Sequence, residues 1–130
     1  MSYERMSSIF YGIEVNTQSL NNDCFRFIEI KPNSELRKAT ADYFEKSIEE
    51  VNGDDLYDFL HDRGHVIDCE FLDSMYIGDN YLTIGEYDSC HSFELEHLTK
   101  CASLTLGIKE FISTLYPDKK VKFWLINWVL

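Results

Sequence analysis

Three aspartates in the middle of the chain are spaced so that their carboxylates could act together. Asp54, Asp58 and Asp62 follow one another at intervals of four residues, which places all three on one face of a helix. The preceding segment carries a second acidic group at helical spacing, formed by Asp42, Glu45 and Glu49. Carboxylates grouped in this way could bind a divalent cation, transfer protons in a hydrolysis, or contact a basic partner.

The sequence argues against the first two of these uses. The residues that follow Asp54 lack the glycine at position six and the glutamate at position twelve of an EF-hand calcium loop. Aspartates on a solvated helix face are also not desolvated, and desolvation is what tunes a carboxyl group for acid–base catalysis. We therefore predict no metal ion, no cofactor and no catalytic residue among them.

Four histidines and four cysteines raise the separate question of a zinc site or a Cys–His catalytic pair. The chain has no C-x-x-C pair, and the adjacent Cys90 and His91 are poorly placed to reach one ion. His97 and Cys101, four residues apart on an expected helix, are the best fragment of a site. We expect free thiols, as is typical of the reducing cytosol. A small enzyme whose histidine, cysteine and carboxylate side chains converge on one pocket is the alternative hypothesis.

Common catalytic and nucleotide-binding motifs are missing from the sequence. It contains no G-x-G-x-x-G, G-x-x-x-x-G-K-[ST], G-x-S-x-G or H-E-x-x-H. Its basic cluster, Lys119, Lys120 and Lys122, is better suited to protecting a sheet edge or pairing with acidic residues than to binding nucleic acid. We therefore expect a protein that has no enzymatic activity and does not bind nucleic acid directly.

The charge distribution favours the third use of the carboxylates, which is contact with a basic partner. Residues 42–73 carry eleven acidic and two basic side chains, and so hold most of the net charge of −11. A charge concentrated on one side attracts a basic surface and repels nucleic acid and anionic membranes. The alternative is that these carboxylates serve solubility alone. The expected partner-binding residues are Asp42, Glu45, Glu49, Asp54, Tyr57, Asp58, Asp62, Asp68 and Glu70, with the tyrosine as an aromatic anchor.

The first elements that position these side chains follow from the hydrophobic pattern. Residues 8–15 alternate, and residues 24–30 are rich in aromatic and β-branched side chains, which predicts a hairpin of two strands. Apolar residues then recur at helical spacing from 35 to 51, and a second helix is predicted over 54–63. These two helices should form an αα-hairpin that presents both acidic groups.

The next elements are predicted from a change in the spacing of the apolar residues. From residue 65 the pattern alternates, so Asp68 and Glu70 should face solvent from one strand. Gly78-Asp79-Asn80 predicts a turn before a further strand over 81–87. Residues 92–116 show helical spacing, although alternation after residue 102 also suits a strand and leaves a break near residue 105 as an alternative.

The chain closes with a strand over residues 119–130 that is apolar on both faces, and we place it in the centre of a sheet. The order ββααββαβ predicts an α+β fold, an antiparallel or mixed sheet of about five strands with helices packed on one face. A chain of this length and 45% apolar content can form one domain over residues 1–130 without disulfides.

The N-terminal residues lack a basic segment followed by an apolar run, and no apolar stretch approaches the ~20 residues of a membrane span. We therefore expect a cytoplasmic protein that does not enter a membrane. The leading hypothesis is an acidic inhibitor of a basic, nucleic-acid-handling enzyme: a toxin-immunity protein or a phage-encoded nucleic-acid mimic that counters bacterial defence. Another alternative is a subunit of a larger assembly, or a homodimer, built on the apolar C-terminal strand.

Overall fold

The computed structural model describes residues 4–69, 73–85, 94–100 and 102–129. Within these ranges the chain forms one four-stranded antiparallel sheet and five α-helices, which confirms an α+β fold. The strands are β1 (Arg5–Asn16), β2 (Val66–Cys69), β3 (Ser74–Gly85) and β4 (Lys122–Val129). The helices are α1 (Leu20–Ile30), α2 (Glu35–Phe44), α3 (Gly53–Asp62), α4 (Leu95–Lys100) and α5 (Leu106–Leu115), with a 3₁₀ turn, η1, at Ile48–Glu50. The predicted five strands and their order are wrong.

The segment that was expected to complete a first hairpin is the helix α1. It buries Leu20, Cys24 and Phe27, whose spacing of four and three residues fits a helix and not a strand. Phe25 and Ile30, which contributed to the strand prediction, stay exposed. The buried helical stripe therefore outweighed the local β propensity of this segment.

The sheet has the strand order β2-β3-β1-β4, so β1 pairs with β3 and β4 and not with its neighbour in sequence. The strand β3 runs through Gly78 without the turn that was predicted there. Gly78 stands opposite Gly12 of β1, and a Cβ atom added to either glycine would lie within 2.1 Å of a backbone oxygen of the other strand. These glycines are therefore needed for close approach of two strands, not for a turn.

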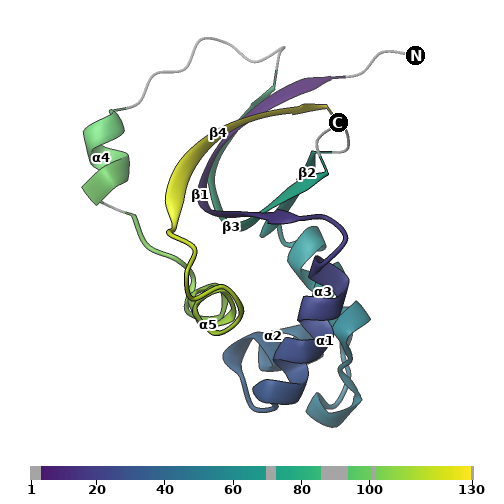
Figure 1. The fold of residues 1–130 in the computed structure, drawn as a ribbon. Helices are drawn as coiled ribbons and strands as arrows, with labels where there is room; N and C mark the ends of the chain where they lie inside the picture. Colours follow the sequence, from purple (N-terminus) through teal and green to yellow (C-terminus); the bar gives the residue numbers. More distant parts are fainter. Residues whose placement is uncertain (1–3, 70–72, 86–93, 101, 130) are drawn as a thin grey trace.

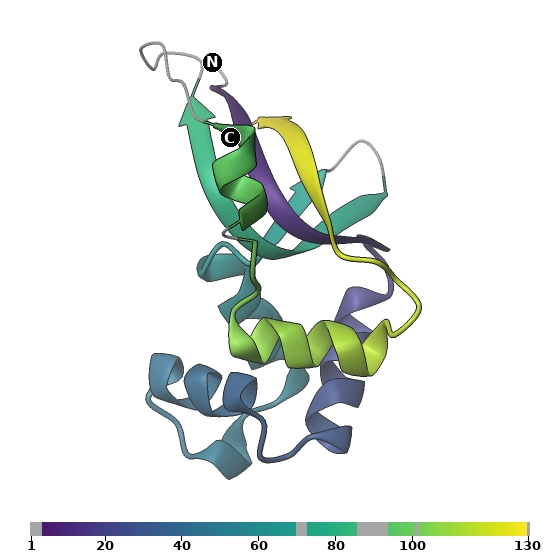
Figure 2. The same cartoon turned by 90° about the vertical axis from the view of Figure 1, so that its left-hand side faces the viewer.

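The two faces of the sheet carry separate apolar clusters. On one face, residues of β1, β2 and β3 pack with α1, α2, α3 and α5, and Figures 1 and 2 show these helices gathered at one end of the molecule. The other face holds a smaller cluster formed by Phe10, Ile67, Tyr76 and Ile126. The strands curve strongly in Figure 1, and the register between β1 and β3 shifts between Ile9 and Phe10. Bulges of this kind bend a sheet, which brings side chains of its inner face together.

The strand β4 forms an edge of the sheet, which corrects its predicted place in the centre. Its inner face contributes the buried Ile126, but Leu125 on the other face is 72% exposed. A hollow of about 400 Å³ lies between this face and α4. An apolar pattern on both faces therefore does not show that a strand is central in its sheet. In β4, the helix beside the strand leaves one apolar face open.

The helical segment before β4 is broken at residues 102–105, as one of the two alternatives predicted. The carboxylate of Asp79 on β3 accepts hydrogen bonds from the backbone N–H and the hydroxyl of Thr105, the N-cap of α5. It also lies 3.0 Å from Nδ1 of His65. Burial acts to raise the pKa of Asp79, but the hydrogen bonds from His65 and Thr105 outweigh it and hold the pKa below its ordinary value.

The variant Asp79→Asn is expected to lose stability that the wild type keeps at neutral pH. Because the pKa of Asp79 is lower in the folded state than in the unfolded one, the carboxylate stabilises the fold above the unfolded value of about 3.8. That contribution disappears as the pH falls through the folded-state pKa. Urea unfolding at a series of pH values should therefore show a gap between the two proteins that closes below about pH 4. A gap that does not change with pH would contradict this role.

Candidate protein-binding surface

The helix α3 carries the row of aspartates that the sequence predicts. Asn52 caps the helix: its side chain accepts a hydrogen bond from the backbone N–H of Asp55, whose carboxylate accepts one from the backbone N–H of Asn52. Gly64, with a φ of +75°, follows the end of the helix. The buried face consists of Leu56, Phe59 and Leu60, as predicted, and the exposed residues include Asp54, Asp58 and Asp62.

The second acidic group does not lie on a single helix, which corrects the predicted helix over 35–51. The helix α2 ends at Phe44 because Glu45 adopts a left-handed φ of 54°, and the N–H of Lys46 bonds to the carbonyl of Ala41. The side chains of Asp42, Glu45 and Glu49 are all exposed, but they stand on α2, on its C-cap and on η1, respectively.

The turn η1 follows this break, and the side chain of its N-cap, Ser47, makes no capping hydrogen bond to the backbone. The Ser47 hydroxyl instead donates a hydrogen bond to the carboxylate of Glu50 at 2.8 Å. The Nε of Arg37 on α2 donates to the carbonyl of Ile48, which ties η1 back to the helix. The acidic side chains of this segment are therefore held beside α2 even though the helix has ended.

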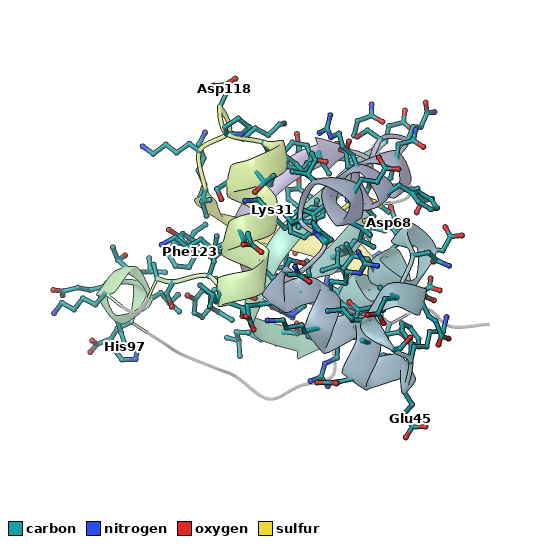
Figure 3. The ribbon with its side chains drawn as sticks, turned by 90° about the horizontal axis from the view of Figure 1, so that it is seen from below. Lys31, Glu45, Asp68, His97, Asp118 and Phe123 are labelled. Atoms are coloured by element: carbon teal, nitrogen blue, oxygen red, sulfur yellow. The ribbon has the colours of Figure 1, made fainter. Side chains whose placement is uncertain are left out.

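The six exposed carboxylates have no cationic partner within 4 Å among the described residues. Of the two bases in this region, Lys46 pairs with Asp55 at 2.9 Å, and the guanidinium of Arg63 lies 5.9 Å from the ring centre of Tyr43. Figure 3 shows Glu45 pointing away from the body of the molecule. The negative charge is therefore directed into solvent. We call Asp42, Glu45, Glu49, Asp54, Asp58 and Asp62 the acidic surface.

Tyr43 is a second tyrosine within the acidic region of the sequence, and it is exposed at this surface. Its ring packs edge-on against Phe59 of α3 at 5.4 Å, its hydroxyl donates to Asp62 at 3.3 Å, and it remains 43% exposed. Helical spacing contained the signal, because Tyr43 follows the buried Thr40 by three residues and so lies at the border of the buried face. An aromatic ring fixed among carboxylates is suited to contact a partner.

Tyr57, the predicted aromatic anchor, is less accessible. Its ring is half-buried and stacks on His61 with ring centres 6.4 Å apart. Burial, followed by the nearby carboxylate of Asp68, raises the pKa of Tyr57. The tyrosine therefore belongs to the packing between α3 and β2 more than to the open surface.

Asp68 is not exposed, although the alternating pattern predicts that it faces solvent. Both Val66 and Ile67 are buried, so neither face of β2 is open. Asp68 itself is half-buried, and its Oδ1 atom is buried without a hydrogen-bond partner. Figure 3 shows Asp68 among other side chains. Glu70, its predicted neighbour, lies outside the described residues.

The histidine and cysteine side chains of the described part do not form a group that could hold a metal ion. His65 contacts Asp79, and His97 lies on the separate helix α4. Cys24 is buried in the core, and burial raises the pKa of its thiol to about 12, which disfavours the thiolate. Cys90, His91 and Cys101, which were also considered as fragments of a zinc site, lie outside the described residues.

A hollow of about 510 Å³ between β2 and the end of β4 is bordered by both His61 and Asp68. On the same side, the indole N–H of Trp128 donates to the Ser8 hydroxyl at 2.9 Å, and that hydroxyl bonds to Thr83 at 2.9 Å. The hollow therefore combines one histidine and one carboxylate with polar groups that satisfy one another. No cysteine of the described residues lines it, although the hypothesis of a small enzyme requires one.

Comparisons with known proteins identified no relative of this chain. A scan against protein-family models and searches of curated proteins and of solved structures found no match to the chain. Within the described ranges, no helix has both the length and the apolar character needed to cross a membrane.

Proposed function

We propose that this protein is a non-enzymatic binding protein that uses its acidic surface to occupy a basic surface of a protein partner. The observation that carries the proposal is the absence of cationic partners for the six exposed carboxylates among the described residues. Like charges four residues apart on α3 cost a few tenths of a kcal/mol per pair. Folding alone does not favour that arrangement, whereas arginine and lysine side chains of a partner would offset its cost.

The partner that fits this surface best is a nucleic-acid-handling enzyme, such as a nuclease or a toxin. The substrate groove of such an enzyme is lined with lysine and arginine because it must bind phosphates. Aspartates four residues apart on α3 stand about 6 Å apart along the helix axis and can present a row of negative charges to that groove. The protein would then act in the cytoplasm as a toxin-immunity protein or as a phage-encoded inhibitor that mimics nucleic acid.

The experiment that tests the proposal measures the association of the purified chain with a purified basic nuclease or toxin from the same host. We expect the association rate constant to fall steeply as the salt concentration rises, since exposed charges are screened beyond about 8 Å at physiological salt. We also expect the bound enzyme to lose activity on nucleic acid. Association that does not depend on salt, or a complex that keeps full activity, would contradict the proposal.

Self-association through β4 is a second candidate, which the exposed edge of the sheet favours. Within the described residues the outer edge of β4 pairs with no strand, and Leu125 and Val129 are 72% and 52% exposed. The charged residue of this strand, Lys122, stands at its start. When two copies pair antiparallel, their lysines lie at opposite ends and do not meet. The acidic α2 lies far from β4 in Figure 1, so it would not oppose such a dimer.

The variant Leu125→Lys is expected to sediment as a monomer at a micromolar concentration at which the wild type sediments as a dimer, because a lysine on the edge strand opposes strand pairing. The matched control is Leu106→Lys, since Leu106 is 69% exposed and lies on another element, α5. A wild-type chain that remains monomeric in analytical ultracentrifugation would exclude this dimer.

A further inference from the structure

A hollow between α5 and the chain leading into β4 differs in character from the acidic surface. It has a volume of about 570 Å³, within the range of small-molecule sites, which is about 300–1,000 Å³. One wall is the face of α5 that carries Lys109, Ile112 and Ser113, and another is the segment Lys119 to Val121. Figures 1 and 2 both show α5 beside the chain that enters β4.

Two lysines border this hollow in a chain whose net charge is −11. The Nζ of Lys119 donates a hydrogen bond to the backbone carbonyl of Glu14 at 2.7 Å, which holds this ammonium group in place. Neither Lys109 nor Lys119 has a carboxylate partner within 4 Å among the described residues, so the prediction that the lysine cluster pairs with acidic residues is not met for Lys119. Each ammonium group has three donors, and both can therefore bind an anionic acceptor.

The rest of the lining is mainly apolar or aromatic. Ile112 and Val121 supply aliphatic walls, and Tyr11 of β1 also lines the hollow. The ring of Tyr11 is fixed by neighbours, with its centre 4.7 Å from that of Phe123 and 6.2 Å from that of Tyr81. A rigid aromatic ring beside two cations is suited to a ligand that has a planar apolar part and an anionic group.

We propose that this hollow is a binding site for a small organic anion with a planar apolar body, such as an aromatic phosphate. Lys109 and Lys119 bind the anionic group, and Tyr11 and Ile112 contact the apolar body. No residue of the acidic surface lines this hollow, and repulsion between exposed charges is largely screened beyond about 8 Å at physiological salt. The site uses none of the residues of the acidic surface, so it stands or falls independently of the proposed function.

The test titrates the full, isotope-labelled chain with 1-naphthyl phosphate and follows the amide resonances by NMR. Its two parts, 1-naphthol and inorganic phosphate, serve as matched probes. We expect 1-naphthyl phosphate to bind with a Kd below about 1 mM and at least about tenfold more tightly than either part, because both halves of the hollow are then used. The resonances that shift should include those of Lys109, Ser113 and Val121.

The double variant Lys109→Gln/Lys119→Gln is expected to bind 1-naphthyl phosphate about tenfold or more weakly, since hydrogen bonds to charged groups are the strong ones. The control Lys31→Gln/Lys38→Gln has the same change of charge at two exposed lysines outside the hollow and should bind like the wild type. The spectra of both variants report whether the fold is kept. No binding at about 1 mM, shifts confined to other residues, or equal binding by the two double variants would overturn the proposal.

Discussion

The variant in which Asp54, Asp58 and Asp62 all become asparagine should associate with the basic partner at least about tenfold more slowly than the wild type at low salt. Charge complementarity speeds protein association by about 10- to 1,000-fold, and this variant removes half of the acidic surface. Its association rate should also depend less on salt, because fewer charges remain to be screened. Stopped-flow measurements over a series of salt concentrations give both quantities.

The control for this experiment changes the net charge by the same amount at other places. In the variant Glu29→Gln/Glu96→Gln/Asp118→Asn, three exposed acidic residues outside the acidic surface lose their charge. If the attraction is local, this control keeps most of the association rate of the wild type. Equal slowing by the two triple variants would mean that only net charge matters, and an unchanged rate in the α3 variant would exclude α3 from the interface.

The substitution Gly12→Ala is expected to destabilise the fold by about 3 kcal/mol or more, near the upper end of what inserting a methyl group into a packed site costs. The new Cβ atom would lie 2.0 Å from the backbone oxygen of Ile77 and 2.9 Å from the Cα atom of Gly78. Both are backbone atoms, so no side-chain rotation relieves the clash. The strands β1 and β3 would have to separate, which weakens the hydrogen bonds between them.

The control for this prediction is Gly64→Ala. An added Cβ atom at Gly64 has no neighbour within 4 Å, but the φ of +75° is unfavourable for alanine by about 1 kcal/mol. Urea unfolding of both variants should therefore place the midpoint for Gly12→Ala clearly below that for Gly64→Ala. Equal midpoints would contradict the close approach of the two strands.

The helix α3 could be predicted from the sequence because several local signals agree there. The row of apolar residues from Leu56 to Leu60, the acidic residues on the opposite face and the stop at Gly64 all belong to one segment. The end of α2 could not be predicted in the same way, because it depends on a left-handed backbone at Glu45, a residue type that rarely marks a helix end. The exposed row of aspartates on α3 was therefore predicted correctly. The acidic residues expected on one longer helix are instead divided between α2, its C-cap and η1.

The errors in the sheet have a different origin, since they depend on contacts between distant parts of the chain. The edge position of β4 follows from its pairing with β1, and the burial of both faces of β2 from the apolar clusters to which Val66 and Ile67 belong. The wrong prediction that Asp68 faces solvent has the same cause, since Asp68 is half-buried. Alternation shows which residues share a face of a strand, but it does not show whether that face is covered. The hollow lined by Lys109 and Lys119 could not be predicted from the sequence either, because the two lysines come from separate elements.

The position of β1 between β3 and β4 also has a consequence for the order in which the molecule can fold. Arg5 lies opposite Val129, so β1 gains its second partner only when nearly the whole described chain is available. The segment from α2 to α3, in contrast, is joined by contacts between residues close in sequence, such as those of Lys46 with Asp55. Because loops between distant residues close slowly, the sheet should be the late and rate-limiting part of folding. The helices that carry the acidic surface would then form early, before β4 pairs with β1 and completes the sheet.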